Sequence, residues 1–184
     1  DWTKVARGKL ELDMQLLKLD ELAFSVVEDL QPNAKAKGLK LTYSGDSTAE
    51  AIADKVRLKQ ILYNLINNAI KFTDKGSIHL AMAKEDGQVV FNVTDTGHGI
   101  SEENLERVFQ RFQQVDGSMS RKSGGLGLGL AISEQLAALH GGTLSLTSKI
   151  GHGSTFTLKM PSSEGVAEGT KSAGETSITI ENVA

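Results

Sequence analysis

A helix over residues 56–72 is the strongest prediction from the pattern of apolar and polar positions. Its apolar residues recur every three or four positions and form one stripe: Leu58, Ile61, Leu62, Leu65 and Ala69. A second stripe is polar, because Asn64, Asn68 and Lys71 lie at i, i+4 and i+7, with Phe72 at its edge. Asparagine is a poor helix former, since its amide competes with the backbone for hydrogen bonds. This asparagine helix either covers an anion and a metal ion or exposes a solvated face, and the helix alone leaves both open.

The pattern before the asparagine helix predicts two strands and one helix. We expect strands over residues 11–17 and 39–43, and a polar loop over 45–50. The helix between the strands is expected over 21–37, with Asp20 as its N-cap and Gly38 as its stop. Pro32 lies inside this helix and is expected to kink it.

After the asparagine helix the pattern predicts two hairpins and two further helices. Strands over 77–83 and 88–95 are joined by the turn Asp86-Gly87, and strands over 143–148 and 154–160 form the last hairpin. Between the hairpins we expect a helix from Ser101 to about residue 112 and another over 126–140.

Composition adds limits to this picture. The chain has 184 residues, 39% of them hydrophobic and 23% charged, as expected for one soluble globular domain. Its net charge of −3 and the absence of a basic run argue against a nucleic-acid partner. Without cysteine it has no disulfide or thiolate metal site. No apolar run is long enough for a membrane span. Because the chain begins at Asp1 rather than Met, we expect a piece of a longer protein.

Residues 95–100, Asp-Thr-Gly-His-Gly-Ile, directly follow a predicted strand. A carboxylate at a strand end accepts hydrogen bonds, and the amino group of adenine is a suitable donor for Asp95. Gly97 and Gly99 would let the backbone approach a flat ring closely. An ordinary Asp-Gly turn is the alternative. We find no second ligand that would make His98 a metal site.

A second glycine-rich segment, residues 124–130, leads into the helix expected over 126–140. Free backbone N–H groups and the helix dipole make such a junction a phosphate site. It is neither a Walker A loop, which needs Lys-Ser/Thr, nor a dinucleotide fingerprint, which follows a strand. A flexible hinge is the alternative. Upstream, Phe109 and Phe112 share one helix face, where core packing is expected.

Five motifs follow one another along the chain, at residues 64–73, 95–99, 109–112, 125–129 and 153–157. In this order they resemble the N, G1, F, G2 and terminal G boxes of sensor histidine kinases. The resemblance covers about residues 1–160 and implies a two-layer α/β sandwich with a mixed, mostly antiparallel sheet and helices on one face. It also implies the end of a dimerisation helix over 1–10, a catalytic ATP-binding domain over 11–161, and a flexible linker or tail over 162–184.

The resemblance implies a role for each matching residue. Asn68 would bind the Mg²⁺ that bridges the phosphates of ATP or ADP, and Asn64 and Lys71 would help hold metal and phosphates as catalytic residues. Phe72 would pack on adenine, while Asp95 would accept from its amino group with help from Thr155. In the loop over 113–125, Arg121 and Lys122 would contact phosphate. The other nucleotide-binding positions implied are Gly97, Gly99, Ile100, Phe112, Gly125, Leu126, Gly127, Leu128 and Gly129.

The reaction implied is transfer of the γ-phosphoryl group of ATP to a histidine, mainly by positioning and charge neutralisation. No acidic residue follows any of the four histidines, as it does in the family's acceptor box, so the acceptor is expected outside this chain. Gln114 and Leu126 stand where many relatives have arginine and threonine, and those two phosphate contacts are therefore not implied.

The partners implied are the protein's own dimerisation and phosphoacceptor domain and a response regulator or fused receiver domain. Residues 113–116, Gln-Gln-Val-Asp, resemble hybrid kinases, which carry such a receiver. We expect a cytoplasmic domain of a membrane-anchored sensor, with no direct membrane contact from these residues.

Two other functions compete with the kinase. Hydrolases of the same fold place a glutamate four residues before the metal asparagine to activate water, but that position is Asn64, and an amide cannot accept the proton. A catalytically silent ATP-sensing or scaffold module is the other alternative. The presence of Asn68, Asp95 and the glycines argues against it.

Overall fold

The computed structural model describes residues 10–105, 108, 129–164 and 180–181, and these form a two-layer α/β sandwich. The main sheet has the strand order β2-β4-β5-β7-β6-β8. Its strands are β2 (Lys40–Ser44), β4 (Ser77–Glu85), β5 (Gln88–Asp95), β6 (Thr143–Lys149), β7 (Gly153–Pro161) and β8 (Ile180–Glu181). The pairs β2–β4 and β6–β8 are parallel and the other three pairs are antiparallel. The predicted mixed, mostly antiparallel sheet is confirmed.

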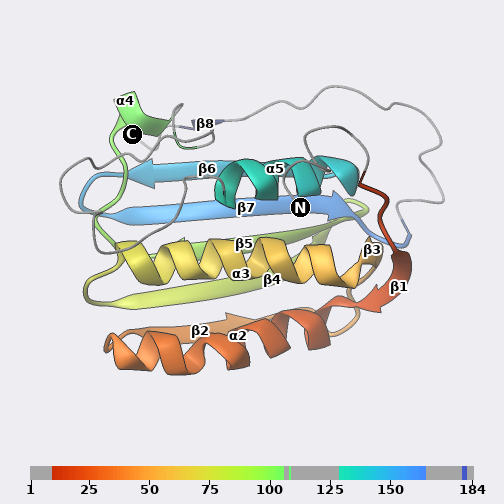
Figure 1. The fold of residues 1–184 in the computed structure, drawn as a ribbon, viewed down its shortest axis with the longest axis horizontal. Helices are drawn as coiled ribbons and strands as arrows, with labels where there is room; N and C mark the ends of the chain where they lie inside the picture. Colours follow the sequence, from red (N-terminus) through yellow and green to blue (C-terminus); the bar gives the residue numbers. More distant parts are fainter. Residues whose placement is uncertain (1–9, 106–107, 109–128, 165–179, 182–184) are drawn as a thin grey trace.

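Three helices lie on one face of this sheet (Figure 1). The helices are α2 (Leu19–Ala36), α3 (Lys55–Phe72) and α5 (Gly129–Leu139), and a short helix α4 (Glu102–Leu105) follows β5. A second, two-stranded antiparallel sheet joins β1 (Met14–Lys18) to β3 (Glu50–Asp54). No helix in the described part of the chain is long and apolar enough to cross a membrane.

The core lies between the helices and the inward face of the sheet. Every residue of the predicted apolar stripe of α3 is buried, from Leu58 to Ala69. Because side chains alternate between the two faces of a strand, β5 and β7 direct every second residue toward these helices. The residues concerned include Phe91, Val93, Phe156 and Leu158. The asparagine helix is thus held by its apolar stripe, which leaves its polar stripe at the rim of the core.

The N-terminal half corrects three expectations. The structure has a strand, β3, over residues 50–54, part of which was expected to be loop. The alternation of apolar and polar residues in β3 covers only five positions, and this segment is a strand because it pairs with β1. The first strand begins at Met14 rather than at residue 11. Asp20 is not an N-cap, because α2 begins at Leu19 and the Asp20 carboxylate accepts a hydrogen bond from the Tyr43 hydroxyl at 2.7 Å.

The helix α2 runs unbroken through Pro32 to Ala36, and the predicted stop, Gly38, follows two residues later with a left-handed φ of +72°. Asp54, for which the sequence pattern made no prediction, caps α3: its carboxylate accepts from the backbone N–H groups of Val56 and Arg57 at 2.9 and 3.0 Å. Of the helix expected from Ser101, residues 106–107 and 109–112 lie outside the described residues, as do the first residues of the helix expected at 126.

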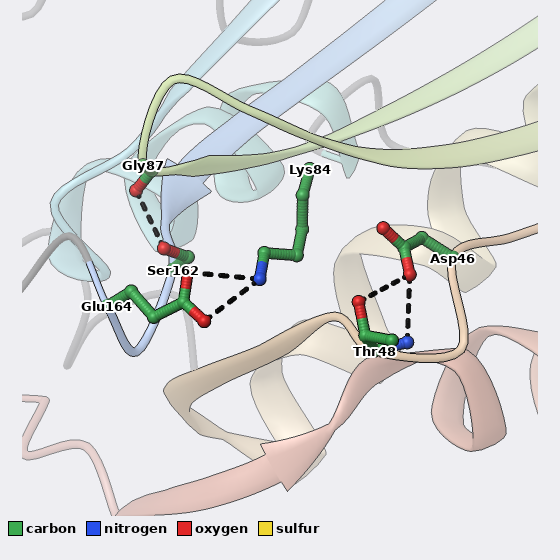
Figure 2. Close-up of polar contacts among 6 residues, drawn as sticks. All are labelled: Asp46, Thr48, Lys84, Gly87, Ser162 and Glu164. Atoms are coloured by element: carbon green, nitrogen blue, oxygen red, sulfur yellow. Dashed lines mark hydrogen bonds and ion pairs between the residues drawn. The ribbon is translucent and has the colours of Figure 1, made fainter.

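Residues 162–164 pack against the end of the sheet that carries the β4–β5 turn (Figure 2). The Ser162 hydroxyl and backbone N–H both donate to the Gly87 carbonyl, at 2.9 and 3.0 Å. Glu164 forms an ion pair with Lys84 at 3.0 Å. Farther along, β8 pairs with β6 at Leu146 and Thr147. The boundary of the catalytic domain at residue 161 and the flexible tail stay predictions.

Candidate nucleotide-binding site

The predicted motifs meet at one end of the molecule. The C-terminal end of α3, the end of β5 and the start of β7 lie together on the left in Figure 1. Asp95, the last residue of β5, pairs with Ser154 of β7, and the Thr96 N–H donates to the carbonyl of Ser77 at 3.1 Å. Residues that are far apart in the sequence are therefore neighbours at this end.

Asn64 faces α5. Its Nδ2 donates to the hydroxyl of the buried Ser133 at 2.9 Å. A Cβ on Gly129, the first residue of α5, would collide with Oδ1 of Asn64, so a larger residue there would displace the Asn64 amide. The structure thus brings together Asn64 and Gly129, two predicted site residues from different motifs.

Asn68 and Lys71 continue the polar stripe toward the end of α3. The Asn68 side chain is partly buried and forms no hydrogen bond within the described part of the chain. The Lys71 ammonium lies 5.1 Å from the centroid of the Phe72 ring, as in a cation–π contact. Phe72 is 41% exposed, and the His98 ring meets it edge-on with 5.8 Å between centroids. An apolar ring and a cation are therefore both accessible beside Asn68.

Lys37 stabilises this end of α3, although the sequence analysis did not single it out. Its ammonium donates to the carbonyls of Ile70 and Lys71 at 2.7 and 2.8 Å. The carbonyls of the last helical turn have no partner within the helix and carry the negative end of its dipole. A lysine near a helix end does not by itself predict a functional contact in the sequence. Only the packing of α2 against α3 shows that Lys37 contacts the end of α3.

Asp95 supplies a buried carboxylate. It is 5% exposed and accepts from the Gly97 N–H at 2.9 Å and from the Ser154 N–H. Burial raises its pKa above the usual range, while these two N–H groups and the nearby His98 act in the opposite direction. A carboxylate has about four acceptor positions, and backbone groups use two of them. Asp95 can therefore accept a further hydrogen bond from a ligand.

Close backbone contacts fix the loop after Asp95. A Cβ on Gly97 would collide with the Phe72 carbonyl oxygen, which joins this loop to the end of α3. Gly99 has a left-handed φ of +71°, and a Cβ there would collide with the carbonyl oxygen of Lys149. The glycines predicted to admit a flat ring thus also let three backbone segments touch.

Two serines in this site were missed by the sequence analysis. Ser148 of β6 and Ser154 of β7 are both 8% exposed, and their hydroxyl oxygens lie 2.8 Å apart. Ser148 also accepts from the N–H of Ile100, another predicted site residue, at 2.8 Å. The sequence pattern could have indicated Ser148. It continues the alternation of Leu144 and Leu146, so it is a hydroxyl at an inward position where a core strand would have an apolar residue.

The structure separates Thr155 from Asp95. Thr155 pairs with Thr94, and their hydroxyl oxygens lie 3.0 Å apart. Because adjacent residues of a strand point to opposite faces, Thr155 lies on the face away from the Asp95 carboxylate. Ser154, directly opposite Asp95, lies on the same face as the carboxylate, and the assisting role expected for Thr155 fits Ser154 instead.

Part of the predicted site lies outside the described residues. This holds for the predicted phosphate and lid contacts Phe112, Arg121, Lys122, Gly125, Leu126, Gly127 and Leu128.

Comparisons with known proteins agree with this geometry. Residues 53–164 match the family model described as histidine kinase-, DNA gyrase B- and HSP90-like ATPase. The circadian input-output histidine kinase CikA of Synechococcus elongatus is 39% identical over 165 residues, which cover 88% of this chain and 22% of that protein. The sensor histidine kinase GacS of Pseudomonas protegens is 40% identical over 177 residues, covering 91% of this chain and 19% of that protein. The chain thus spans about a fifth of these relatives' length.

Solved structures show the same fold. Full-length ShkA in complex with AMPPNP aligns with a TM-score of 0.79 and 32% identity, covering 88% of this chain and 34% of ShkA. The catalytic domain of the histidine kinase ThkA aligns with a TM-score of 0.72 and 25% identity, covering 82% of this chain and 96% of that domain. The chain therefore belongs to the histidine kinase-, DNA gyrase B- and HSP90-like ATPase family, as the ATP-binding catalytic domain of a sensor histidine kinase.

Proposed function

We propose that this domain transfers the γ-phosphoryl group of ATP to a histidine of a dimerisation domain that lies outside the chain. The observation that carries this proposal is the asparagine at position 64 and its hydrogen bond. Its amide donates to Ser133, and an amide cannot take a proton from water at neutral pH. Hydrolysis, the reaction of the glutamate-bearing members of the fold, thus lacks its general base at this position.

The residues at the end of α3 fit a metal-bound polyphosphate. Mg²⁺ takes oxygen ligands and keeps several of its waters, so one amide oxygen from the protein is a suitable contribution. Asn68 is partly buried without a hydrogen-bond partner in the described part of the chain, and its amide oxygen would hold the ion. Lys71, one turn farther on, is exposed and would neutralise phosphate charge. When bound, the metal would neutralise the charge that develops during phosphoryl transfer.

The residues at the end of β5 fit adenine. Asp95 has acceptor positions left for the exocyclic amino group, and the exposed ring of Phe72 offers an apolar surface beside it. That ShkA has been solved with AMPPNP, an ATP analogue, supports ATP as the nucleotide.

The partners follow from the relatives and stay proposals. The names of the relatives include a hybrid signal transduction histidine kinase of Dictyostelium discoideum, 39% identical over 165 residues that cover 85% of this chain and 10% of that protein. We infer that the phosphoacceptor domain and a response regulator or receiver domain interact with this domain, and that the whole protein is a membrane-anchored sensor with this domain in the cytoplasm.

The test supplies this chain with ATP, Mg²⁺ and a separately produced dimerisation domain of the same protein, and measures phosphohistidine with γ-labelled ATP. Asn68→Asp should abolish transfer, because it replaces the neutral amide by a negatively charged carboxylate, which repels the phosphates. Asn67→Asp is the matched control, since Asn67 is the neighbouring exposed residue outside the polar stripe and should retain transfer. Full transfer by Asn68→Asp would refute the metal role. Phosphate release without phosphohistidine would identify a hydrolase, and no ATP binding would favour a scaffold.

A further inference from the structure

We infer that Ser148 determines the selectivity of this site for an amino group over a carbonyl group on the base, an inference that rests on the proposed nucleotide binding. Ser148 acts as a positioning residue, through Ser154 and Ile100. Neither serine belongs to the residues that the sequence analysis assigned to the site.

The hydrogen-bonding capacity of Ser148 is fully used. A serine hydroxyl has one hydrogen to donate and two lone pairs that accept. The Ser148 hydroxyl donates to the carbonyl of Gly153 at 2.9 Å and accepts from the N–H of Ile100 at 2.8 Å. Its one remaining lone pair faces the Ser154 hydroxyl, whose oxygen lies 2.8 Å away. All of these contacts can be hydrogen bonds at the same time only if Ser154 is the donor in the contact between the two serines, and we assign it as the donor on this ground.

This fixes what Ser154 can offer to a ligand. With its only hydroxyl hydrogen directed at Ser148, Ser154 retains lone pairs alone. It lies opposite Asp95 on the same face of the sheet, and the carboxylate of Asp95 is likewise an acceptor. Two adjacent acceptors match the two hydrogens of an exocyclic amino group. They repel a carbonyl oxygen at the same place, which would leave both without a donor.

The contact with Ile100 has a second effect. Ser148 is the acceptor for the N–H of the residue that ends the Asp-Thr-Gly-His-Gly-Ile segment, so it ties the loop after Asp95 to the β6–β7 hairpin. Removing the hydroxyl leaves this N–H without its partner and frees the Ser154 hydroxyl to rotate and donate. The base site would then tolerate a carbonyl group.

The experiment measures the dissociation constants of ATP and GTP with Mg²⁺ for the whole chain, by calorimetry, in wild type and Ser148→Ala. The ratio of GTP to ATP dissociation constants should fall about tenfold in Ser148→Ala, which corresponds to the loss of one discriminating hydrogen bond. In an ¹⁵N–¹H spectrum the Ile100 amide signal should move and exchange faster with solvent. Ser148→Thr, which retains a hydroxyl, should restore the ratio.

Ser162→Ala is the matched control for lost stability. Ser162 is also a buried serine, 1% exposed, whose hydroxyl donates to a backbone carbonyl, but it lies at the β4–β5 turn, away from the site (Figure 2). Its variant should lower the melting temperature and leave the ratio unchanged. If the alanine variant does not fold, Ser148→Cys replaces it, because a thiol is only a weak hydrogen-bond donor and acceptor.

The outcomes separate this inference from the proposed function. ATP binding by the wild type together with an unchanged ratio in Ser148→Ala, or in its cysteine replacement, would overturn the role of Ser148 and leave the kinase proposal intact. An equal fall of the ratio in Ser162→Ala would overturn it as well. No binding of ATP by the wild type would overturn both.

Discussion

At the scale of single residues, the site combines a carboxylate that is expensive to bury with amides that carry no charge. Asp95 is almost inaccessible and its burial raises its pKa, whereas Asn64 and Asn68 add polarity to α3 without ionising. Burying a charge costs free energy unless partners compensate for it. Asp95 is therefore retained at a cost to stability, as expected for a residue that serves a ligand.

Asp95→Asn should reveal this cost. A carboxyl group whose pKa is raised in the folded state stabilises the fold at a pH below its unfolded pKa, and this contribution is lost as the pH rises through the folded pKa. The stability of Asp95→Asn relative to wild type should therefore increase from pH 4 to pH 7. Thermal unfolding at several pH values measures this difference, and a difference that does not change with pH would contradict the argument.

The same variant should weaken nucleotide binding. The asparagine amide can present only one oxygen to two backbone donors and the adenine amino group, so affinity for ATP should fall about tenfold. Affinity for GTP should change less. An unchanged preference for ATP over GTP in a competition assay would count against the assignment of Asp95 to adenine.

At the scale of elements, the helix α3 delivers three predicted site residues in its last two turns, and its end is held by another helix. Lys37 at the end of α2 donates to the carbonyls of Ile70 and Lys71. The Schellman-type turn at Gly38, in which Leu39 N–H donates to the Ala34 carbonyl at 2.9 Å, positions Lys37 for this contact. The packing of α2 and α3 is therefore part of the site.

Lys37→Met should loosen the end of α3. It removes two hydrogen bonds from a charged donor and a favourable interaction with the helix dipole, so we expect a loss of about 1 kcal/mol in unfolding free energy. The loss should become smaller at high salt, and ATP binding should weaken. Lys35→Met is the control, because Lys35 is an exposed lysine in the last turn of the same helix. Equal effects of the two substitutions in denaturant unfolding would contradict the role of Lys37.

The elements also show what local sequence could predict. The helix α3 and the hairpin β4–β5 were predicted to within two residues, because 3.6-residue periodicity and the turn Asp86-Gly87 are local signals. The strand β3 was not predicted, since five residues carry little periodicity and their pairing partner, β1, lies more than thirty positions away. Asp20 was mistaken for a cap because its true partner, Tyr43, is on another element.

At the scale of the whole molecule, the nucleotide site and residues 162–164, which directly follow β7, lie at opposite ends of the sheet (Figure 1). Ser162 bonds to Gly87, and the Ser163 N–H donates to the carbonyl of Glu50 at 2.9 Å. These contacts place the first residues of the expected linker against β3 and the β4–β5 turn. Folding stability and nucleotide binding should therefore respond separately to changes there.

Truncation tests this separation. A chain ending after Pro161 loses the backbone and side-chain hydrogen bonds of Ser162 and Ser163, and should be less stable by about 2 kcal/mol than a chain ending after Glu164. The exposed ion pair of Glu164 should add little. Both chains should bind ATP equally, because the lost contacts are at the far end of the sheet. Denaturant unfolding and calorimetry measure the two properties, and equal stability would place the boundary at residue 161.

The family resemblance of the motifs implied the fold class. The amino-acid sequence was enough to predict the polar stripe of α3 and the order of the motifs, because periodicity and glycine spacing are properties of neighbouring residues. It also excluded a glutamate base at Asn64. The three-dimensional structure was needed to show that Asn64 bonds to Ser133, that Ser154 rather than Thr155 shares a face with Asp95, and that Ser148 and Lys37 contact the site. Each of these depends on strand register or helix packing, which bring together residues that no local pattern connects.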